Sequence, residues 1–170
     1  RLSVGYSNTN VKLIGTHCGI GIGEDGYSQM GLEDIALIRS FPNITILQPA
    51  DEIETREVIK YAVENEGPMF IRLTRQNLDD VHSKDYKFVL GKGDLLHEGN
   101  DATIFATGGV TGNSLSAAKE LAKEGFNLRV INIPTIKPID KEIIIKAAKE
   151  TKHIFTIEDH SITGGLGSVV

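Results

Sequence analysis

The 170-residue sequence has no tryptophan, one cysteine and only five prolines. The single cysteine, Cys18, cannot form an internal disulfide, which favours a reducing compartment, and we expect a cytoplasmic protein. The scarcity of proline, with 40% hydrophobic residues and charge spread along the chain, excludes a collagen-like or disordered sequence. The composition therefore predicts a globular protein with a buried core.

An excess of positive charge and long apolar runs are also missing. The formal net charge is −5 and lysine and arginine form no run, so we expect neither nucleic acid nor a membrane surface as a partner. No segment approaches the roughly 18 apolar residues of a membrane span, and no signal segment is recognisable. The chain begins at Arg1 without a methionine, in what resembles the end of a helix, so we expect a piece of a longer protein.

Short apolar runs alternate with longer amphipathic stretches, which is typical of strands and crossover helices in a parallel sheet. The predicted fold class is α/β, with two consecutive small units that each contain a mostly parallel sheet. We place the units at residues 1–78 and 102–170, joined by a connector at 79–101 that carries one or two edge strands, one of them suggested by YKFVL. The predicted strands lie at residues 11–15, 44–48, 69–73, 102–107, 128–133 and 153–159.

Capping residues indicate where the helices begin. Ser28 is a candidate N-cap for a helix that ends before the break at Phe41. Asp51 followed by Glu54 resembles a capping box. The apolar face of that second helix is predicted from residues Ile53, Val58, Ile59, Ala62 and Val63. Asp140 is the predicted N-cap of the last helix, which ends near residue 150.

GIGEDG, residues 21–26, has the G-x-G-x-x-G spacing of a dinucleotide-binding turn. Such a turn directly follows a strand, whereas five residues intervene here, and Glu24 and Asp25 would repel a pyrophosphate. Two other interpretations are a flexible glycine loop and a loop that directs Asp25 at a polar ligand. With His17 and Gln29 close in sequence, the acid, imidazole and amide suit a hydroxylated substrate.

Several longer blocks, in the same order, resemble a known family. The blocks THCGIGIGEDGYSQM and GPMFIRLTRQNL are similar to the pyrimidine-binding domain of transketolase. Further along, VINIPTIKPID and TIEDHSITGGLG resemble the transketolase C-terminal domain, a three-layer α/β unit that is truncated here. The resemblance covers nearly the whole chain. It implies transfer of a two-carbon ketol unit between sugar phosphates of the pentose phosphate pathway, with thiamine diphosphate and a divalent metal, Mg or Ca.

The resemblance assigns roles to four residues. His17 and Arg75 match positions that hold the substrate phosphate, and a guanidinium can do so with two parallel hydrogen bonds. Judged alone, His17 would be a surface residue and Arg75 an arginine paired to an acid. Asp25 matches an aspartate that binds a sugar hydroxyl. Gln29 stands where many members have histidine, and an amide cannot move a proton at neutral pH.

The resemblance also implies what this chain lacks. The family's catalytic glutamate and the aromatic residues against the cofactor ring lie upstream of Arg1, and another domain holds the diphosphate and metal. We therefore name no catalytic or metal-binding residue, leave the cofactor contacts open, and expect no activity from these residues alone. The expected partner is a second copy in a homodimer or a split subunit with the diphosphate-binding domain.

Alternatives to this interpretation remain. The protein could be a non-catalytic assembly or regulatory subunit, or another thiamine-dependent enzyme such as deoxyxylulose-phosphate synthase, although LTRQNL speaks against the latter. In the second unit, Glu158, Asp159 and His160 are followed by a glycine turn and could suggest an acid-base site. We interpret them as an exposed acidic strand end instead.

Overall fold

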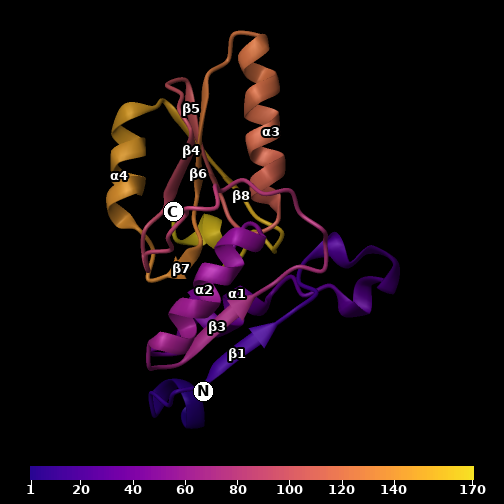
Figure 1. The fold of residues 1–170 in the computed structure, drawn as a ribbon, viewed down its shortest axis with the longest axis vertical. Helices are drawn as coiled ribbons and strands as arrows, with labels where there is room; N and C mark the ends of the chain where they lie inside the picture. The colour runs from indigo at the N-terminus through magenta and orange to yellow at the C-terminus, as the bar shows by residue number, and fades with distance from the viewer.

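The structure is a computed structural model that describes all 170 residues. It contains two four-stranded sheets, with strand orders β1-β3-β2-β7 and β4-β6-β5-β8. Figure 1 shows the second sheet above the first, so the two predicted α/β units lie one on top of the other. The predicted fold class is confirmed, because three strands of each sheet run parallel to one another.

The first sheet contains β1 (Lys12–Gly15), β2 (Thr45–Leu47) and β3 (Met69–Arg72), all close to their predicted positions. Its helices are α1 (Asp34–Arg39) and α2 (Glu52–Glu64). β3 pairs with β1 on one side and β2 on the other, in parallel register. The strand ends at Gly15 and Arg72 therefore meet at one edge of the sheet, where a parallel α/β sheet places its ligands.

The second sheet contains β4 (Asp94–His97), β5 (Ala102–Ala106), β6 (Leu128–Asn132) and β8 (His153–Ile157). Helices α3 (Val110–Lys123) and α4 (Lys141–Glu150) lie on opposite sides of these strands (Figure 1). Asp140 caps α4 as predicted, since its side chain accepts from the backbone N–H groups of Glu142 and Ile143. β4 is the edge strand that we expected in the connector.

The remaining strand, β7 (Thr135–Lys137), was not predicted. It belongs to the second unit in sequence, yet it pairs antiparallel with β2 of the first sheet. With three residues, β7 is too short to show the alternation of apolar side chains by which a strand is recognised in a sequence. The two units therefore share the first sheet. The unit boundaries at residues 78 and 101 stay a prediction.

The hydrophobic core is also shared. Its largest cluster joins residues of both units around β2, β3, β5, β6 and β7: Ile35, Ile44, Ile46, Phe70, Phe105, Ile131, Ile133, Ile136, Ala147 and Leu166. A second cluster, formed by Leu47, Val58, Ala62, Met69 and Ile71, packs α2 on the first sheet. Burying ten side chains between the units makes relative motion costly.

The predicted N-cap of α2, Asp51, is confirmed, whereas the return bond of the capping box goes to the residue before it. Asp51 accepts a hydrogen bond from the N–H of Glu54, and Glu54 accepts one from the N–H of Ala50. The predicted apolar face is wrong at Val63, which is 82% exposed. Val58 and Ala62 are buried as predicted, and the third buried residue of this helix is Glu54, whose exposure is 0%.

Two other local predictions are wrong. Ser28 does not cap α1: the helix begins at Asp34 after Glu33, with no side-chain cap, and Ser28 lies in a 3-10 turn. An α-helix cannot run from Ser28 into α1, because Gly31 between them forms a β-bridge with Cys18. YKFVL forms no strand, since Phe88 and Leu90 pack against the α2 core instead.

Candidate functional site

The segment between β1 and α1 forms a loop of two short 3-10 helices, Ile20–Asp25 and Tyr27–Gln29. We call residues 16–30 the glycine loop. Gly23, with φ 63° and ψ −107°, breaks the first 3-10 helix, and Gly26, with φ 78°, separates the two. Both conformations are in the left-handed region that glycine tolerates. Because GIGEDG neither follows a strand directly nor opens an α-helix, it is not a dinucleotide turn.

The glycine loop surrounds a hollow of about 580 Å³ that is open to solvent. Its lining residues are Thr16, His17, Ile22, Asp25 and Gln29. Three of the four residues that we singled out in the sequence therefore meet here. His17 is exposed, has φ 64°, and its Nδ1 lies 2.8 Å from Thr16 Oγ1.

Arg75, the fourth predicted residue, lies in the loop after β3 and contacts Asp25, one of the residues that line the hollow. Its Nη1 donates a hydrogen bond to Asp25 Oδ2, and its Nη2 lies 3.7 Å from Glu24 Oε1. The arginine and aspartate side chains are each about two-fifths exposed, at 41% and 43%. The arginine is thus paired to an acid without a ligand, and its other N–H groups remain available to an anion.

The hollow can bind a ligand that is both anionic and hydroxylated. Arg75 and His17 offer donors, Asp25 offers acceptors, and the Gln29 amide offers both. The donor set fits a metal diphosphate poorly, because its one carboxylate already pairs with Arg75, whereas Mg and Ca require several oxygen ligands.

A second group of polar side chains lies buried between the two units. Glu54 accepts hydrogen bonds from the Nδ2 atom of Asn132, at 3.0 Å to each oxygen, and from Tyr86 Oη at 2.6 Å. Tyr86 Oη also lies 2.9 Å from Asp94 Oδ2. Asp51 Oδ2 lies 2.8 Å from His82 Nδ1. We call this group the junction cluster: Asp51, Glu54, His82, Tyr86, Asp94 and Asn132.

Burial sets the protonation of the junction cluster. It raises the pKa of Glu54, against the opposing charge of His82, and the pKa of Asp94 for the same reason. Burial also favours a raised pKa for Asp51, but hydrogen bonds from His82 and from backbone N–H groups outweigh it and lower that pKa to about 2. The cluster is a buried structural connection between the two units and the connector.

Glu54, His82 and Asp94 have ligand atoms within 4.8 Å of one another, close enough for a metal ion. Each oxygen of Glu54 nevertheless already accepts two hydrogen bonds, so the carboxylate has no free lone pair of good geometry. The cluster also lies apart from the glycine loop. We therefore assign it no metal.

The end of β8 differs from its predicted exposed character. Glu158 accepts from the N–H groups of Leu166 and Gly167, and Asp159 accepts from the N–H of Ile20 in the glycine loop. His160 Nδ1 lies 2.7 Å from the carbonyl of Ser161, and the residue is buried. These residues are thus neither exposed nor an acid-base site. Nothing in the sequence signals the contact with Ile20, which joins positions 139 residues apart.

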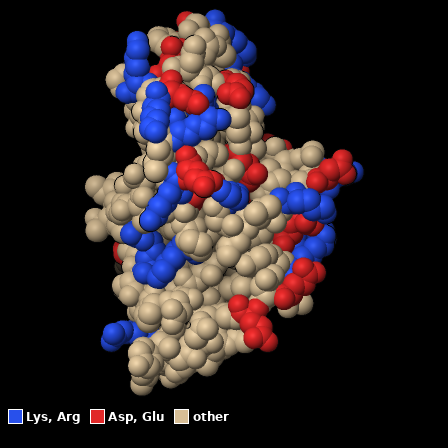
Figure 2. Space-filling model, turned by 90° about the vertical axis from the view of Figure 1, so that its left-hand side faces the viewer, with Lys and Arg blue, Asp and Glu red and all other residues tan.

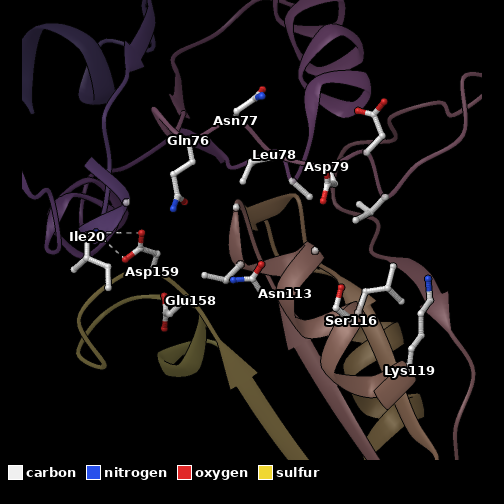
Figure 3. A pocket seen from close by; sticks show the side chains of 18 residues that line it. Ile20, Gln76, Asn77, Leu78, Asp79, Asn113, Ser116, Lys119, Glu158 and Asp159 are labelled. Atoms are coloured by element: carbon white, nitrogen blue, oxygen red, sulfur yellow. Dashed lines mark hydrogen bonds between the residues drawn. The ribbon is translucent and has the colours of Figure 1, made fainter. Parts of the chain in front are cut away.

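Beside this contact lies a cleft of about 570 Å³ between the two units. In Figure 3, Gln76 and Asn77 face it from the first unit, and Asn113, Ser116 and Lys119 face it from α3. Ile20 and Asp159 close one end.

None of the helices has the length and apolar character needed to span a bilayer.

Comparison with known proteins decides the family. The family model for the transketolase pyrimidine-binding domain matches residues 1–81, and that for the transketolase C-terminal domain matches residues 91–170. This chain belongs to the transketolase family. The family's domains imply use of thiamine diphosphate and a divalent metal.

Two transketolase relatives show how much of the family this chain represents. It is 38% identical over 170 residues to an apulose-4-phosphate transketolase subunit of Actinobacillus succinogenes, covering 100% of this chain and 55% of that protein. It is 40% identical over 169 residues to a putative transketolase C-terminal section of Methanocaldococcus jannaschii, covering 98% and 52%. The chain thus spans about half the length of the curated relatives it matches.

A solved transketolase structure has the same fold. It is a split gene transketolase described as an inactive beta4 tetramer, with a TM-score of 0.91 and 43% identity. The match covers 99% of this chain and 54% of that one. The two units therefore have the arrangement of a transketolase subunit.

Proposed function

We propose that this chain is the part of a transketolase that binds the phosphate and hydroxyl groups of sugar phosphates. The observation that carries the proposal is that His17, Asp25 and Gln29 line one solvent-open hollow and that Arg75 pairs with Asp25. Thiamine diphosphate, when bound, supplies the nucleophile that attacks the ketose carbonyl. Regions outside this chain supply most of the contacts to the diphosphate and its metal.

Each residue has a definite task in this proposal. Arg75 holds the phosphate with parallel hydrogen bonds, and His17 donates a further one. Asp25 accepts from a sugar hydroxyl and disfavours the epimer that would leave it unpaired. Gln29 orients a hydroxyl, and because its amide does not titrate, any proton transfer there uses another group or water.

The proposed partner is a subunit or second copy that carries the diphosphate-binding domain. β1 is an edge strand with Leu13 and Ile14 exposed at 39% and 53%. Figure 2 shows a tan area with few charged side chains in the lower middle of one face, with charged groups at its margins, whereas the upper part mixes both signs. A broad area with few charges is typical of surfaces that pack against another subunit. Sedimentation of the full-length protein as a stable, dilute monomer would count against this part of the proposal.

The test uses the full-length chain assembled with its partner. Ketol transfer from xylulose 5-phosphate to ribose 5-phosphate is compared in wild type, Arg75→Ala and the control Arg56→Ala, whose exposed arginine pairs only with Glu52 on α2. We expect Arg75→Ala alone to raise the Michaelis constants, by about tenfold to a hundredfold.

Unphosphorylated xylulose sharpens the test. Arg75→Ala should change its Michaelis constant little, because that sugar has no phosphate to lose contact with. If the constants for phosphorylated sugars stay unchanged, Arg75 has no phosphate role. If the wild-type assembly transfers no ketol unit at all, the non-catalytic assembly role becomes the better interpretation.

A further inference from the structure

The glycine loop is held at its base by a residue of the second unit. Both carboxylate oxygens of Asp159, just after β8, accept from the backbone N–H of Ile20, at 2.9 Å and 3.1 Å (Figure 3). The loop makes room for this carboxylate at Gly19, where a Cβ atom would lie 1.9 Å from Asp159 Oδ2. Gly19 also has φ 71°, so another residue would be strained there.

Asp159 is itself fixed to the first unit by Arg72, a fully buried residue at the end of β3. Arg72 Nη2 donates to the carbonyl of Asp159 at 3.0 Å and to the carbonyl of Gly31 at 2.8 Å. Gly31 in turn accepts from the N–H of Gly19 at 2.9 Å. Arg72 Nε donates to Asp34 Oδ2 at 2.8 Å, which orients the guanidinium. One guanidinium therefore connects Gly31, directly after the glycine loop, with Asp159 of the second unit, and Gly31 in turn holds Gly19.

The rest of the glycine loop has few anchors of its own. Between residues 20 and 29, the backbone hydrogen bonds are local, as from Gly26 to Gly23 and from Gln29 to Gly26. The N–H of Ile20 is the backbone group in this stretch that bonds to another part of the chain. The position of Asp25 and Gln29 thus depends on the contact between Ile20 and Asp159, together with the side-chain pair of Asp25 and Arg75.

We propose that Asp159 is a positioning residue: the second unit uses its carboxylate to hold the glycine loop in the conformation that binds sugar phosphates. This inference rests on the proposed function for the role of the loop, but the loop contact itself does not. A carboxylate that accepts a backbone N–H makes a charge-assisted hydrogen bond, which is stronger than a neutral one. The C-terminal unit accordingly contributes to the substrate site without touching substrate.

The first measurement is hydrogen exchange on the full-length chain with its partner. In Asp159→Ala, we expect the amides of residues 20–29 to exchange about tenfold faster than in wild type. Asp159→Asn retains a side-chain oxygen that can accept from Ile20, so it should restore most of the protection. The matched control is Glu158→Ala, which removes the neighbouring carboxylate, whose hydrogen bonds go to Leu166 and Gly167. It should leave residues 20–29 unchanged.

The second measurement is ketol transfer. Asp159→Ala should raise the Michaelis constant for sugar phosphates by about tenfold with a smaller change in kcat, and Asp159→Asn should recover it. Unchanged exchange of residues 20–29 in Asp159→Ala overturns the proposal, as does faster exchange with an unchanged Michaelis constant. Equal effects of Asp159→Ala and Glu158→Ala would show a general packing role instead and also overturn it. A wild-type assembly without ketol transfer refutes the proposed function, whereas the exchange data still decide the loop contact.

Discussion

Asn132 of β6 donates its side-chain amide to both carboxylate oxygens of Glu54 on α2, at 3.0 Å each. Both side chains have 0% exposure, so the contact joins the two units inside the protein. Tyr86, from the connector, binds the same carboxylate. The junction cluster thus links both units and the segment between them through one buried acid.

Removing this acid should strongly destabilise the fold. Glu54→Ala leaves Asn132 Nδ2 and the N–H of Ala50 without a partner and removes one of the two partners of Tyr86 Oη. We expect a loss of about 3 kcal/mol or more in the free energy of unfolding, measured by denaturant titration. Glu52→Ala, on the exposed face of the same helix, is the matched control and should change little. Equal stabilities of the two variants would contradict the assigned role of Glu54.

The junction cluster should lose stability as the pH rises. Tyr86 Oη has one hydrogen but lies within hydrogen-bond distance of both Glu54 and Asp94, so its hydroxyl cannot fully satisfy two ionised carboxylates. Burial raises the pKa of Asp94. A raised pKa in the folded state means that the stabilisation is complete below the ordinary pKa, about 3.8, and is lost as the pH rises through the raised value.

Asp94→Asn provides the corresponding test. Its amide can donate to Tyr86 at every pH, so the free energy of unfolding should depend less on pH above about 4 than in wild type. Asp85→Asn removes a nearby exposed acid and serves as the control. Unfolding at a series of pH values measures both variants. Identical pH profiles of wild type and Asp94→Asn would mean that protonation of Asp94 does not stabilise the cluster.

The contribution of Asp51 to the free energy of unfolding should depend on pH in the opposite direction and be lost in acid. Its pKa, lowered to about 2 in the fold, gives a stabilisation that is complete above about 3.8 and is lost as the pH falls towards 2. The contribution is about 2 kcal/mol at neutral pH. Asp51→Asn should flatten acid unfolding in this range, and an acid-unfolding curve as steep as that of wild type would contradict the assignment.

The shared core predicts a single unfolding transition. Ile136 on β7 is 1% exposed and packs in the cluster that joins both units. Ile136→Ala should cost about 2–4 kcal/mol and shift one common transition, observed identically by far-ultraviolet circular dichroism and by tyrosine fluorescence. Two separate transitions in wild type would show that the units unfold independently.

Asp25 should determine which sugar epimer reacts. Asp25→Ala removes the acceptor for the sugar hydroxyl, so the ratio of kcat/KM between two epimeric ketose phosphates should fall by at least about tenfold. Glu24→Ala removes the adjacent, more exposed acid and is the control. A preserved ratio in Asp25→Ala would assign epimer selection to another residue.

The sequence predicted the elements whose signal is local. Apolar runs alternating with amphipathic stretches predicted β1, β2, β3, β5, β6 and β8. Asp51 and Asp140 predicted the starts of α2 and α4, because an N-cap bonds to residues only two or three positions away. The resemblance to transketolase singled out His17, Asp25, Gln29 and Arg75. The first three line one hollow and Arg75 pairs with Asp25, while their roles in binding substrate stay a prediction.

Features created by distant contacts could not be predicted. Ser28 has the chemistry of an N-cap, but the bridge between Cys18 and Gly31 delays α1 until Asp34. Glu54 and Asp159 resemble exposed acids in the sequence because their partners lie 78 and 139 residues away, at Asn132 and Ile20. Only the folded chain reveals those pairs.

The pairing of β7 with β2 also has a consequence for synthesis on the ribosome. Ile46 and Leu47 pair with Lys137 and Thr135, which lie about 90 residues further along the chain. At ordinary translation rates the ribosome adds these residues roughly 5–20 seconds later. During that interval one edge of the nascent first sheet has unpaired N–H and C=O groups beside apolar side chains, a combination that promotes aggregation. The late strand β7 therefore covers an edge of the first sheet that is open until the second unit is made.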